Sequence, residues 1–220
     1  GAGCASFRCD REYTIGVNLH NEPDRGYSVV RVCTWDRAGL FSRMAGSLSA
    51  VGLTILSAQI FTRSDGIALD TFFVTDALTG KLANAEQRDQ FENLLIRVLQ
   101  DDNLDLHKLI AQQKISRPLY QAYAGEQIPT QIAFDNDMSD TRTFIEVETE
   151  DRIGLLYTIA RTLTDLELDI STARICTEKG AAIDSFYVRE LDGGKILSAE
   201  RQKAIERRLV HAITAMARTD

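Results

Sequence analysis

Several features that mark common classes of protein are missing from this sequence. No stretch approaches the roughly 20 consecutive apolar residues that a membrane-spanning helix needs. The first residues, Gly1-Ala2-Gly3, provide neither the basic start nor the apolar core of a signal peptide. Hydrophobic residues make up 44% of the chain, which is ordinary for a globular protein and excludes a disordered tail. We therefore predict a soluble, cytoplasmic protein with no membrane partner.

Basic residues are in the minority. Lys and Arg number 25 against 32 Asp and Glu, which gives a formal net charge of −7 and a pI near 5.1. Binding to nucleic-acid phosphates requires a basic stripe, which such a composition does not favour. The sequence predicts small molecules or proteins as partners, and no nucleic acid.

Motifs that carry chemistry are also lacking. The four cysteines stand singly and the three histidines lie far apart, so neither residue type shows the spacing of a metal site or a dithiol redox site. The sequence has no phosphate-binding glycine loop, no dinucleotide fingerprint and no nucleophile elbow. We predict reduced, structural thiols, no metal site and no catalytic residue in this chain.

An internal repeat is the most informative feature that is present. The segment 32–40 recurs as 147–155 at an offset of 115 residues, and both copies end in Asp-Arg-x-Gly-Leu. After a one-residue slip the offset becomes 114, and 70–74 matches 184–188. Matches that extend over so many positions indicate a tandem duplication.

Each copy predicts the same order of elements: strand, helix, strand, strand, helix. The first strands are expected at 27–34 and 143–149, the first helices end near Gly52 and Glu167, the hairpin turns lie at 64–66 and 178–180, and the second helices span 85–100 and 198–217. Asp36 and Asp151 precede the first helices and are expected to be their N-caps, and Ser198 is expected to cap the last helix. Leucines between 102 and 127 predict another short helix in the connection.

Each unit needs one more strand to complete its sheet. The segment 128–134 is available to the first unit, whereas the second unit has none after its last helix. The segment 14–19 lies 115 residues before 129–134 and is its counterpart in the repeat. We expect this N-terminal strand to complete the second unit, in cis or from a partner chain, which leaves no unpaired edge. Two units interlocked in this way would not fold well alone.

The repeated loop allows two interpretations. A helix that begins after a strand presents unpaired amides and a positive dipole end, which favour a carboxylate, while Asp36 and Asp151 suit an ammonium group. Together these groups fit a zwitterion. In the alternative, the aspartate caps the helix, the arginine packs over the edge and the glycine permits the turn, with no ligand.

These residues resemble a known family. Asp36–Ser42, Ala58–Thr62, Asp65-Gly66 and Leu69–Phe72, with Asp151–Tyr157, Ala173–Thr177 and Asp184–Val188, are similar to paired ACT domains, above all to the tandem pair that ends the bifunctional uridylyltransferase and uridylyl-removing enzymes acting on the PII nitrogen-signalling protein. The resemblance implies two α+β, ferredoxin-like βαββαβ units with antiparallel sheets and helices on one face.

The resemblance also implies a function. The ACT pair of that family is regulatory and is implied to sense glutamine, whereas the nucleotidyltransferase and hydrolase chemistry lies in upstream domains that use a divalent metal such as Mg²⁺. Those domains are not in this chain, so we expect an excised regulatory fragment without a cofactor, whose partners are a small amino acid, the upstream catalytic domains and a second copy in a homodimer. The alternative is a free-standing ACT-repeat protein that dimerises or docks on a partner and binds no small molecule.

The expected boundaries are 1–26 for the N-terminal segment with the completing strand, 27–136 for the first unit and 137–220 for the second.

The expected ligand-binding residues lie in both loops and on the neighbouring strands: Asp36, Arg37, Ala38, Gly39, Leu40, Ser57, Gln59, Asp151, Arg152, Ile153, Gly154, Leu155, Thr172 and Arg174. The family often has proline before the glycine, whereas this chain has Ala38 and Ile153, so both loops are expected to be less rigid. The neighbours of the motif differ, and the sequence does not decide whether one loop or both bind a ligand.

Overall fold

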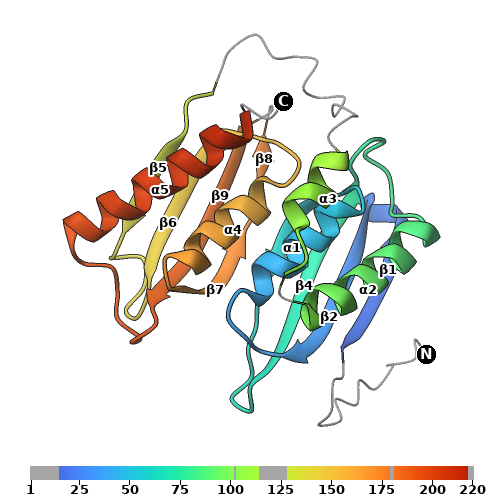
Figure 1. The fold of residues 1–220 in the computed structure, drawn as a ribbon, viewed down its shortest axis with the longest axis horizontal. Helices are drawn as coiled ribbons and strands as arrows, with labels where there is room; N and C mark the ends of the chain where they lie inside the picture. Colours follow the sequence, from blue (N-terminus) through green and yellow to red (C-terminus); the bar gives the residue numbers. More distant parts are fainter. Residues whose placement is uncertain (1–14, 102, 114–127, 179–180, 218–220) are drawn as a thin grey trace.

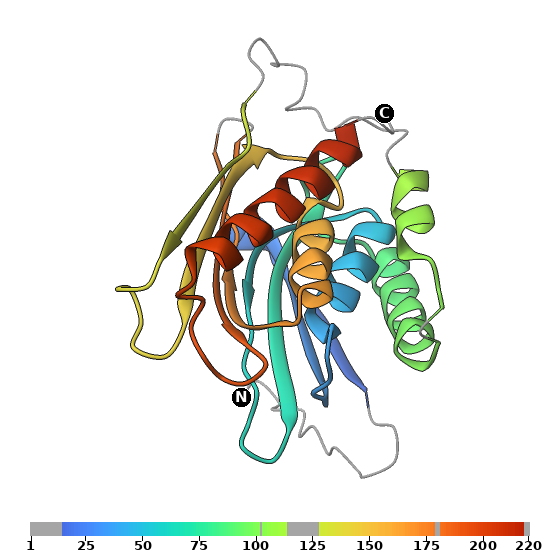
Figure 2. The same cartoon turned by 60° about the vertical axis from the view of Figure 1, so that its left-hand side comes forward.

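The computed structural model describes residues 15–101, 103–113, 128–178 and 181–217. The first unit contains β1 (Gly16–Glu22), a 3-10 turn (Pro23–Arg25), β2 (Tyr27–Trp35), α1 (Leu40–Ala50), β3 (Leu53–Gln59), β4 (Ile67–Asp76), α2 (Ala85–Gln100) and α3 (Leu106–Gln113). The second contains β5 (Gln131–Asp135), β6 (Thr143–Glu150), α4 (Leu155–Asp165), β7 (Leu168–Arg174), β8 (Thr177–Glu178), β9 (Ala181–Glu190) and α5 (Ala199–Ala217). The two units lie side by side, with the helices over one face of the sheets (Figures 1 and 2).

Both sheets are antiparallel and have the same topology. The strand order is β1-β2-β4-β3 in the first unit and β5-β6-β9-β7 in the second, where the short β8 also pairs with β9. This confirms the α+β, ferredoxin-like repeat, and the short helix expected in the connection is α3. The expected turn at 178–180 includes residues 179 and 180, which lie outside the described residues.

The expected exchange of the N-terminal strand is wrong. β1 pairs with β2 of its own unit, in a register that runs from Gly16 opposite Cys33 to Glu22 opposite Tyr27, and β5 pairs with β6. The reason is local. Gly26, in a left-handed conformation with φ 74°, closes a short turn between β1 and β2, and closing a short loop costs less entropy than recruiting a strand from far along the chain. Segment 16–22 thus belongs to the first sheet, and 131–135 to the second.

The same pair of hydrogen bonds connects the edge hairpin to the chain just before the second helix of each unit, α2 and α5. Ser28 Oγ donates to Asn21 Oδ1 at 2.7 Å and accepts from the backbone N–H of Ala83 at 2.8 Å. In the second unit Thr143 Oγ1 donates to Asn136 Oδ1 at 2.7 Å and accepts from Ile196 at 2.8 Å. The duplicated chain has kept this polar contact at matching positions.

The first helix of each unit ends as the sequence predicts. α1 and α4 stop at Ala50 and Asp165, and the left-handed residues Gly52 (φ 75°) and Glu167 (φ 61°) follow them. Such residues are common just beyond a helix C-terminus. The last helix is capped by Ser198, whose Oγ accepts from the backbone N–H of Arg201 at 3.4 Å.

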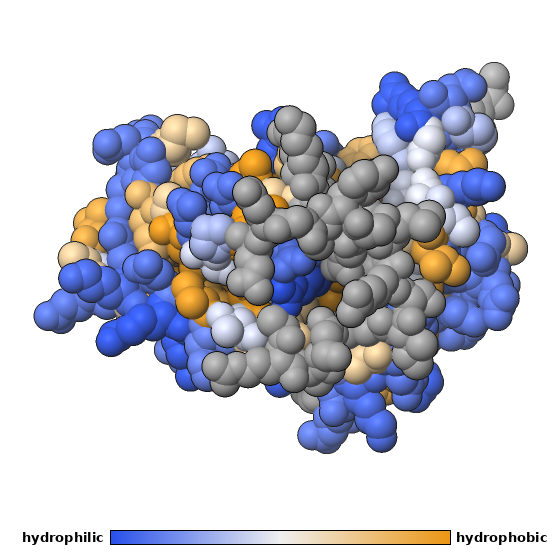
Figure 3. Space-filling view, turned by 90° about the horizontal axis from the view of Figure 1, so that it is seen from above, coloured by the Kyte–Doolittle hydropathy of each residue, from blue (hydrophilic) through white to orange (hydrophobic). Residues whose placement is uncertain are grey.

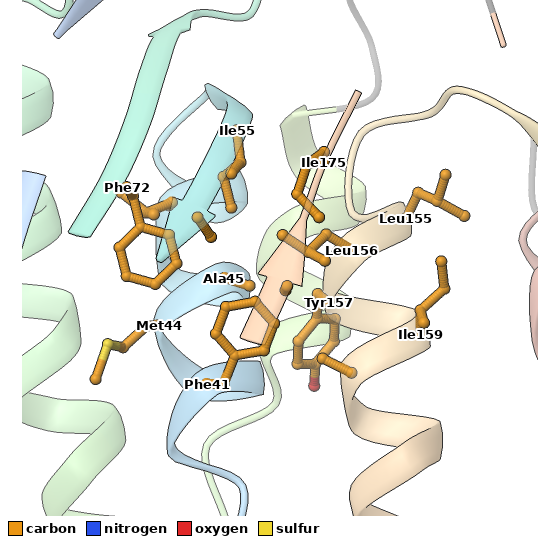
Figure 4. Packing of buried hydrophobic residues seen from close by; sticks show 14 of the residues in the cluster. Phe41, Met44, Ala45, Ile55, Phe72, Leu155, Leu156, Tyr157, Ile159 and Ile175 are labelled. Atoms are coloured by element: carbon orange, nitrogen blue, oxygen red, sulfur yellow. The ribbon is translucent and has the colours of Figure 1, made fainter. Parts of the chain in front are cut away.

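One hydrophobic core runs through both units. Phe41 and Ala45 of α1 and Leu156 and Tyr157 of α4 lie between the two helices (Figure 4). Seen from above, hydrophilic residues make up most of the visible surface at both sides of the molecule, and hydrophobic residues show in smaller patches (Figure 3). Burial of these apolar side chains therefore holds the two units against each other.

Gly46 of α1 lies where only a residue without a Cβ fits against the second unit and α3. A Cβ added there would lie 2.7 Å from Tyr157 Cδ2 and 2.8 Å from Leu106 Cδ1. We expect Gly46→Ala to destabilise the protein by about 1–3 kcal/mol, because the ring and the α3 side chain must move, and to lower Tm by roughly 2–4 °C for each kcal/mol. Thermal unfolding checks this. The double variant Gly46→Ala/Tyr157→Leu should recover part of the lost Tm, because the smaller side chain makes room for the added Cβ. An unchanged Tm for Gly46→Ala would contradict the close packing of Gly46 against Tyr157 and Leu106.

Candidate functional site

The two Asp-Arg-x-Gly-Leu loops connect β2 to α1 and β6 to α4 with the same backbone geometry. The N–H of Leu40 donates to the carbonyl of Arg37 at 3.1 Å, and that of Leu155 to the carbonyl of Arg152 at 3.0 Å. Gly39 and Gly154 therefore occupy the N-cap positions, and no side chain caps either helix. The expectation that Asp36 and Asp151 cap the helices is wrong, because this tight turn places them three residues before the N-cap.

The two glycines are required by conformation and by space. Gly39 has φ 73° and Gly154 φ 83°, a region that residues with a Cβ rarely adopt. A Cβ on Gly39 would lie 3.3 Å from Thr164 Cγ2 of the second unit, and one on Gly154 would lie 2.8 Å from Ile110 Cγ2 of α3. A bulky residue at either position would therefore strain the backbone and disturb packing as well as any ligand.

The two arginines of the motif bind different protein groups. Arg37 Nη1 donates to the carbonyl of Leu99 at the end of α2, at 2.7 Å. Arg152 Nη2 forms an ion pair with Glu150 Oε2 at 2.6 Å. Both guanidinium groups thus already have partners within the first and the second unit, respectively.

A cavity of about 490 Å³ opens at the first loop, between the two units. The first unit contributes Asp36, Arg37, Ala38, Gly39, Leu40, Phe41, Ile60, Thr62, Ala68 and Asp70, and the second contributes Thr164, Glu167, Leu168, Asp169, Ile170, Arg189 and Leu191. This volume lies within the range of small-molecule sites, about 300–1,000 Å³. The loop of one unit and the first residues of β7 of the other therefore form one site.

The cavity that Asp151 and Arg152 line at the second loop is much smaller. It measures about 30 Å³ and is lined by Asp151, Arg152, Ile153, Gly154 and Leu155 together with residues of α1, β3 and β9. That is room for about one water molecule. Residues of the first unit lie against this loop and leave little space: Ser49 at the end of α1 and Leu53, Thr54 and Ile55 of β3. The duplication has produced one open site and one closed site.

The comparisons with known proteins agree with this architecture. A family model described as an ACR9-like, ACT-like domain matches residues 131–219, and the first unit repeats the same topology. The two units are tandem ACT domains.

Proteins similar to this ACT pair include much longer enzymes. The bifunctional uridylyltransferase/uridylyl-removing enzymes of Azospirillum brasilense and Rhodospirillum rubrum are each 37% identical to it, over 94% and 93% of this chain but only 22% of each enzyme. A crystal structure of aspartate kinase from Synechocystis aligns with 83% of this chain and 26% of that chain, with a TM-score of 0.43 and 11% identity. The chain therefore spans about a fifth of the length of the enzymes that it matches.

Two buried aspartates are the site residues that the sequence reasoning missed. Asp70 of β4 is 2% exposed and Asp184 of β9 is 1% exposed, and they line the open and the closed cavity, respectively. Desolvation by burial raises the pKa of Asp70 to about 7 and that of Asp184 to about 8, and the nearby charges of Asp36 and Asp151 act in the same direction.

Each of these carboxyl groups accepts one backbone hydrogen bond, from Phe61 at 3.2 Å for Asp70 and from Cys176 for Asp184. Both bonds lower the pKa but do not offset desolvation. Asp184 Oδ1 has no hydrogen-bond partner among the described residues. The signal in the sequence was an aspartate at the same place in both ACT units, in phase with the apolar residues that alternate along the strand, Ala68 and Phe72 in β4 and Ala182 and Phe186 in β9.

The remaining predicted residues lie away from the loop cavities. Ser57 and Gln59 are on β3, and Thr172 and Arg174 are on β7; Ser57 is half-buried and the other three are exposed. None of the four lines either loop cavity, although Thr172 lines a further cavity. The β-bulges between Ile55 and Ser57 and between Ile170 and Thr172 shift the register at these points, which the sequence pattern did not indicate.

No helix among the described residues is long and apolar enough to cross a membrane. No group of three or more His, Cys, Asp or Glu side chains is placed to hold a metal ion in the part of the chain that the structure describes.

Proposed function

We propose that this chain is a regulatory module that binds a free amino acid in the cavity at the first loop, with L-glutamine as the first candidate. The observation that carries the proposal is the pairing of the Asp36 carboxylate with a helix N-terminus in one cavity. Asp36 lines it beside the first turn of α1, and the buried carboxyl group of Asp70 lines it as well. Carboxylates attract an α-ammonium group, and helix amides attract an α-carboxylate.

The position of the cavity suggests how binding regulates. A ligand there touches the loop of the first unit and β7 of the second, so its affinity depends on how the two units pack. A ligand shifts an equilibrium only through different affinities for two arrangements. Binding would therefore favour the packing in which both walls contact the amino acid, and an attached catalytic domain would sense that change.

The choice of glutamine and of the attached enzyme rests on resemblance. The relatives named above carry the name bifunctional uridylyltransferase/uridylyl-removing enzyme, and the ACT pair of that family is implied to sense glutamine. We propose that this chain serves an enzyme of that kind in nitrogen regulation and itself contributes no catalytic group.

Thermal unfolding of this chain with each of the twenty amino acids tests the proposal. A ligand at 100 times its dissociation constant adds about 2.7 kcal/mol of stability, which for a chain of this size raises Tm by roughly 5–10 °C. We expect such a rise with L-glutamine and a smaller one, or none, with D-glutamine. A chain that responds to no amino acid would overturn the proposal and favour a module that only docks on a partner.

A further inference from the structure

A third cavity, of about 730 Å³, adjoins the proposed amino-acid site. It shares Asp36, Ile60, Thr62, Asp169, Ile170 and Arg189 with the first-loop cavity. Its further lining includes Arg142, which immediately precedes β6, and Tyr187 of β9. The side chains of Tyr187 and Arg189 flank Val188, a fully buried core residue of the same strand. Because side chains alternate along a strand, both lie on the face of the sheet opposite the helices.

Two arginines share one carboxylate in this cavity. Arg189 Nε lies 2.8 Å from Asp169 Oδ2, and Arg142 Nη1 lies 3.8 Å from the same oxygen. Arg142 Nη1 is buried and has no hydrogen-bond partner among the described residues. Burial and the charge of Arg189 lower the pKa of Arg142, although a guanidinium remains charged. The cluster of two arginines and one aspartate therefore has a net charge of +1. It also has one buried N–H donor, on Arg142, that Asp169 does not satisfy.

The first unit shows that the fold does not require this cluster. Arg142, Arg189 and Asp169 are cross-strand neighbours, as the register of β6, β9 and β7 shows. The matching positions in the first unit are Tyr27, Thr75 and Thr54, with the same register. One copy of the duplicated domain thus folds with neutral residues where the other has three charges. A half-buried cation without a full partner is costly to keep, which points to a function.

We infer that Arg142 and Arg189 bind the carboxylate or phosphate group of a small anionic molecule. A guanidinium fork binds either oxyanion through two parallel hydrogen bonds, and the buried Nη1 of Arg142 is a donor that such a group would satisfy. Asp36 of the first unit is the other carboxylate in the lining, so the anionic end of the molecule points to the second unit. This inference does not require the amino-acid site.

Titration of this chain with inorganic phosphate and with succinate tests the inference. Each is added at constant ionic strength against sodium chloride, and binding is followed by calorimetry and by Tm. We expect at least one of the two anions to bind and to raise Tm, and Arg142→Gln to weaken that binding at least tenfold. Binding of phosphate alone or of succinate alone identifies which oxyanion the site takes. The control Arg207→Gln removes an exposed charge on α5 and should bind like the wild type.

A second variant covers the case in which Arg142→Gln does not fold. Arg142→Tyr/Asp169→Thr/Arg189→Thr copies the residues of the first unit, which folds with them, and should abolish anion binding. The inference is overturned if neither anion binds the wild type, or if a folded variant binds as tightly as the wild type. L-Glutamine is titrated into the wild type and into Arg142→Gln, because Arg142 lines the third cavity and not the first-loop cavity. Glutamine binding that is retained in Arg142→Gln reports on the amino-acid site, so failure of one proposal is distinct from failure of the other.

Discussion

Asp36→Asn is expected to weaken L-glutamine binding about 10- to 100-fold, because a hydrogen bond to a charged group contributes about 1.5–3 kcal/mol. Asp36 lines the open cavity, is exposed, and accepts a long hydrogen bond from Thr62 Oγ1, at 3.4 Å. Its carboxylate is therefore available to an α-ammonium group, which an amide of the same shape attracts far less. Isothermal titration calorimetry of the folded variant measures the change.

The repeat supplies a matched control for this experiment. Asp151→Asn makes the same change at the equivalent position of the second loop, where the cavity is about 30 Å³ and cannot hold an amino acid. We expect its affinity for L-glutamine to stay within about twofold of the wild type, since no ammonium group reaches that loop. Equal losses in the two variants would show that the volumes of the cavities do not decide where the ligand binds.

The second large effect concerns pH. The unfolded chain loses the proton of an aspartate near pH 3.9, whereas burial raises the pKa to about 7 for Asp70 and about 8 for Asp184 in the folded state. Between these values the unfolded state binds fewer protons, so the stability that each of these two carboxyl groups contributes is fully present below about pH 4 and is lost as pH rises to 7 or 8. Each carboxyl contributes a slope of up to about 1.4 kcal/mol per pH unit.

Asp184→Asn should remove the contribution of that residue to the pH dependence of stability. The amide keeps the shape of the protonated acid and never ionises, so the variant is expected to lose less stability between pH 5 and 8 than the wild type and to be more stable at pH 8. Urea unfolding at several pH values measures both quantities. Asp24→Asn, an exposed position in the first unit, serves as the control and should follow the wild-type curve. An unchanged slope in Asp184→Asn would mean that this carboxyl is already ionised in the fold.

Much of the fold was predictable because the sequence contains the same pattern of elements twice. Two copies of the same apolar periodicity, each followed by a left-handed position at Gly52 or Glu167, fixed the order of strands and helices. The pairing of β1 was not predictable in the same way. Segment 16–22 and segment 131–135 are equivalent in the repeat, and periodicity does not say which sheet a strand joins. The short turn at Gly26 decides it.

The candidate site was only partly predictable. The motif correctly placed both loops at helix N-termini, and the residues beside it differ, but the sequence did not indicate which loop is open. That difference comes from tertiary packing, because α1 and β3 of the first unit lie against the second loop. Asp169 and Arg189, which also line the first-loop cavity, belong to the second unit. No local sequence pattern could show that they lie beside the first loop. Asp70 and Asp184 were visible as a repeated match, but their burial was not.

The most direct test of the central claim is a crystal structure of this chain grown with saturating L-glutamine. The account predicts one amino acid per chain, in the cavity between the first loop and β7, with its ammonium group at Asp36 and its carboxylate at the first turn of α1. Ligand density at the second loop, or at any place away from the Asp36 cavity, would contradict it, as would an unoccupied cavity in crystals of a chain that calorimetry shows to be saturated.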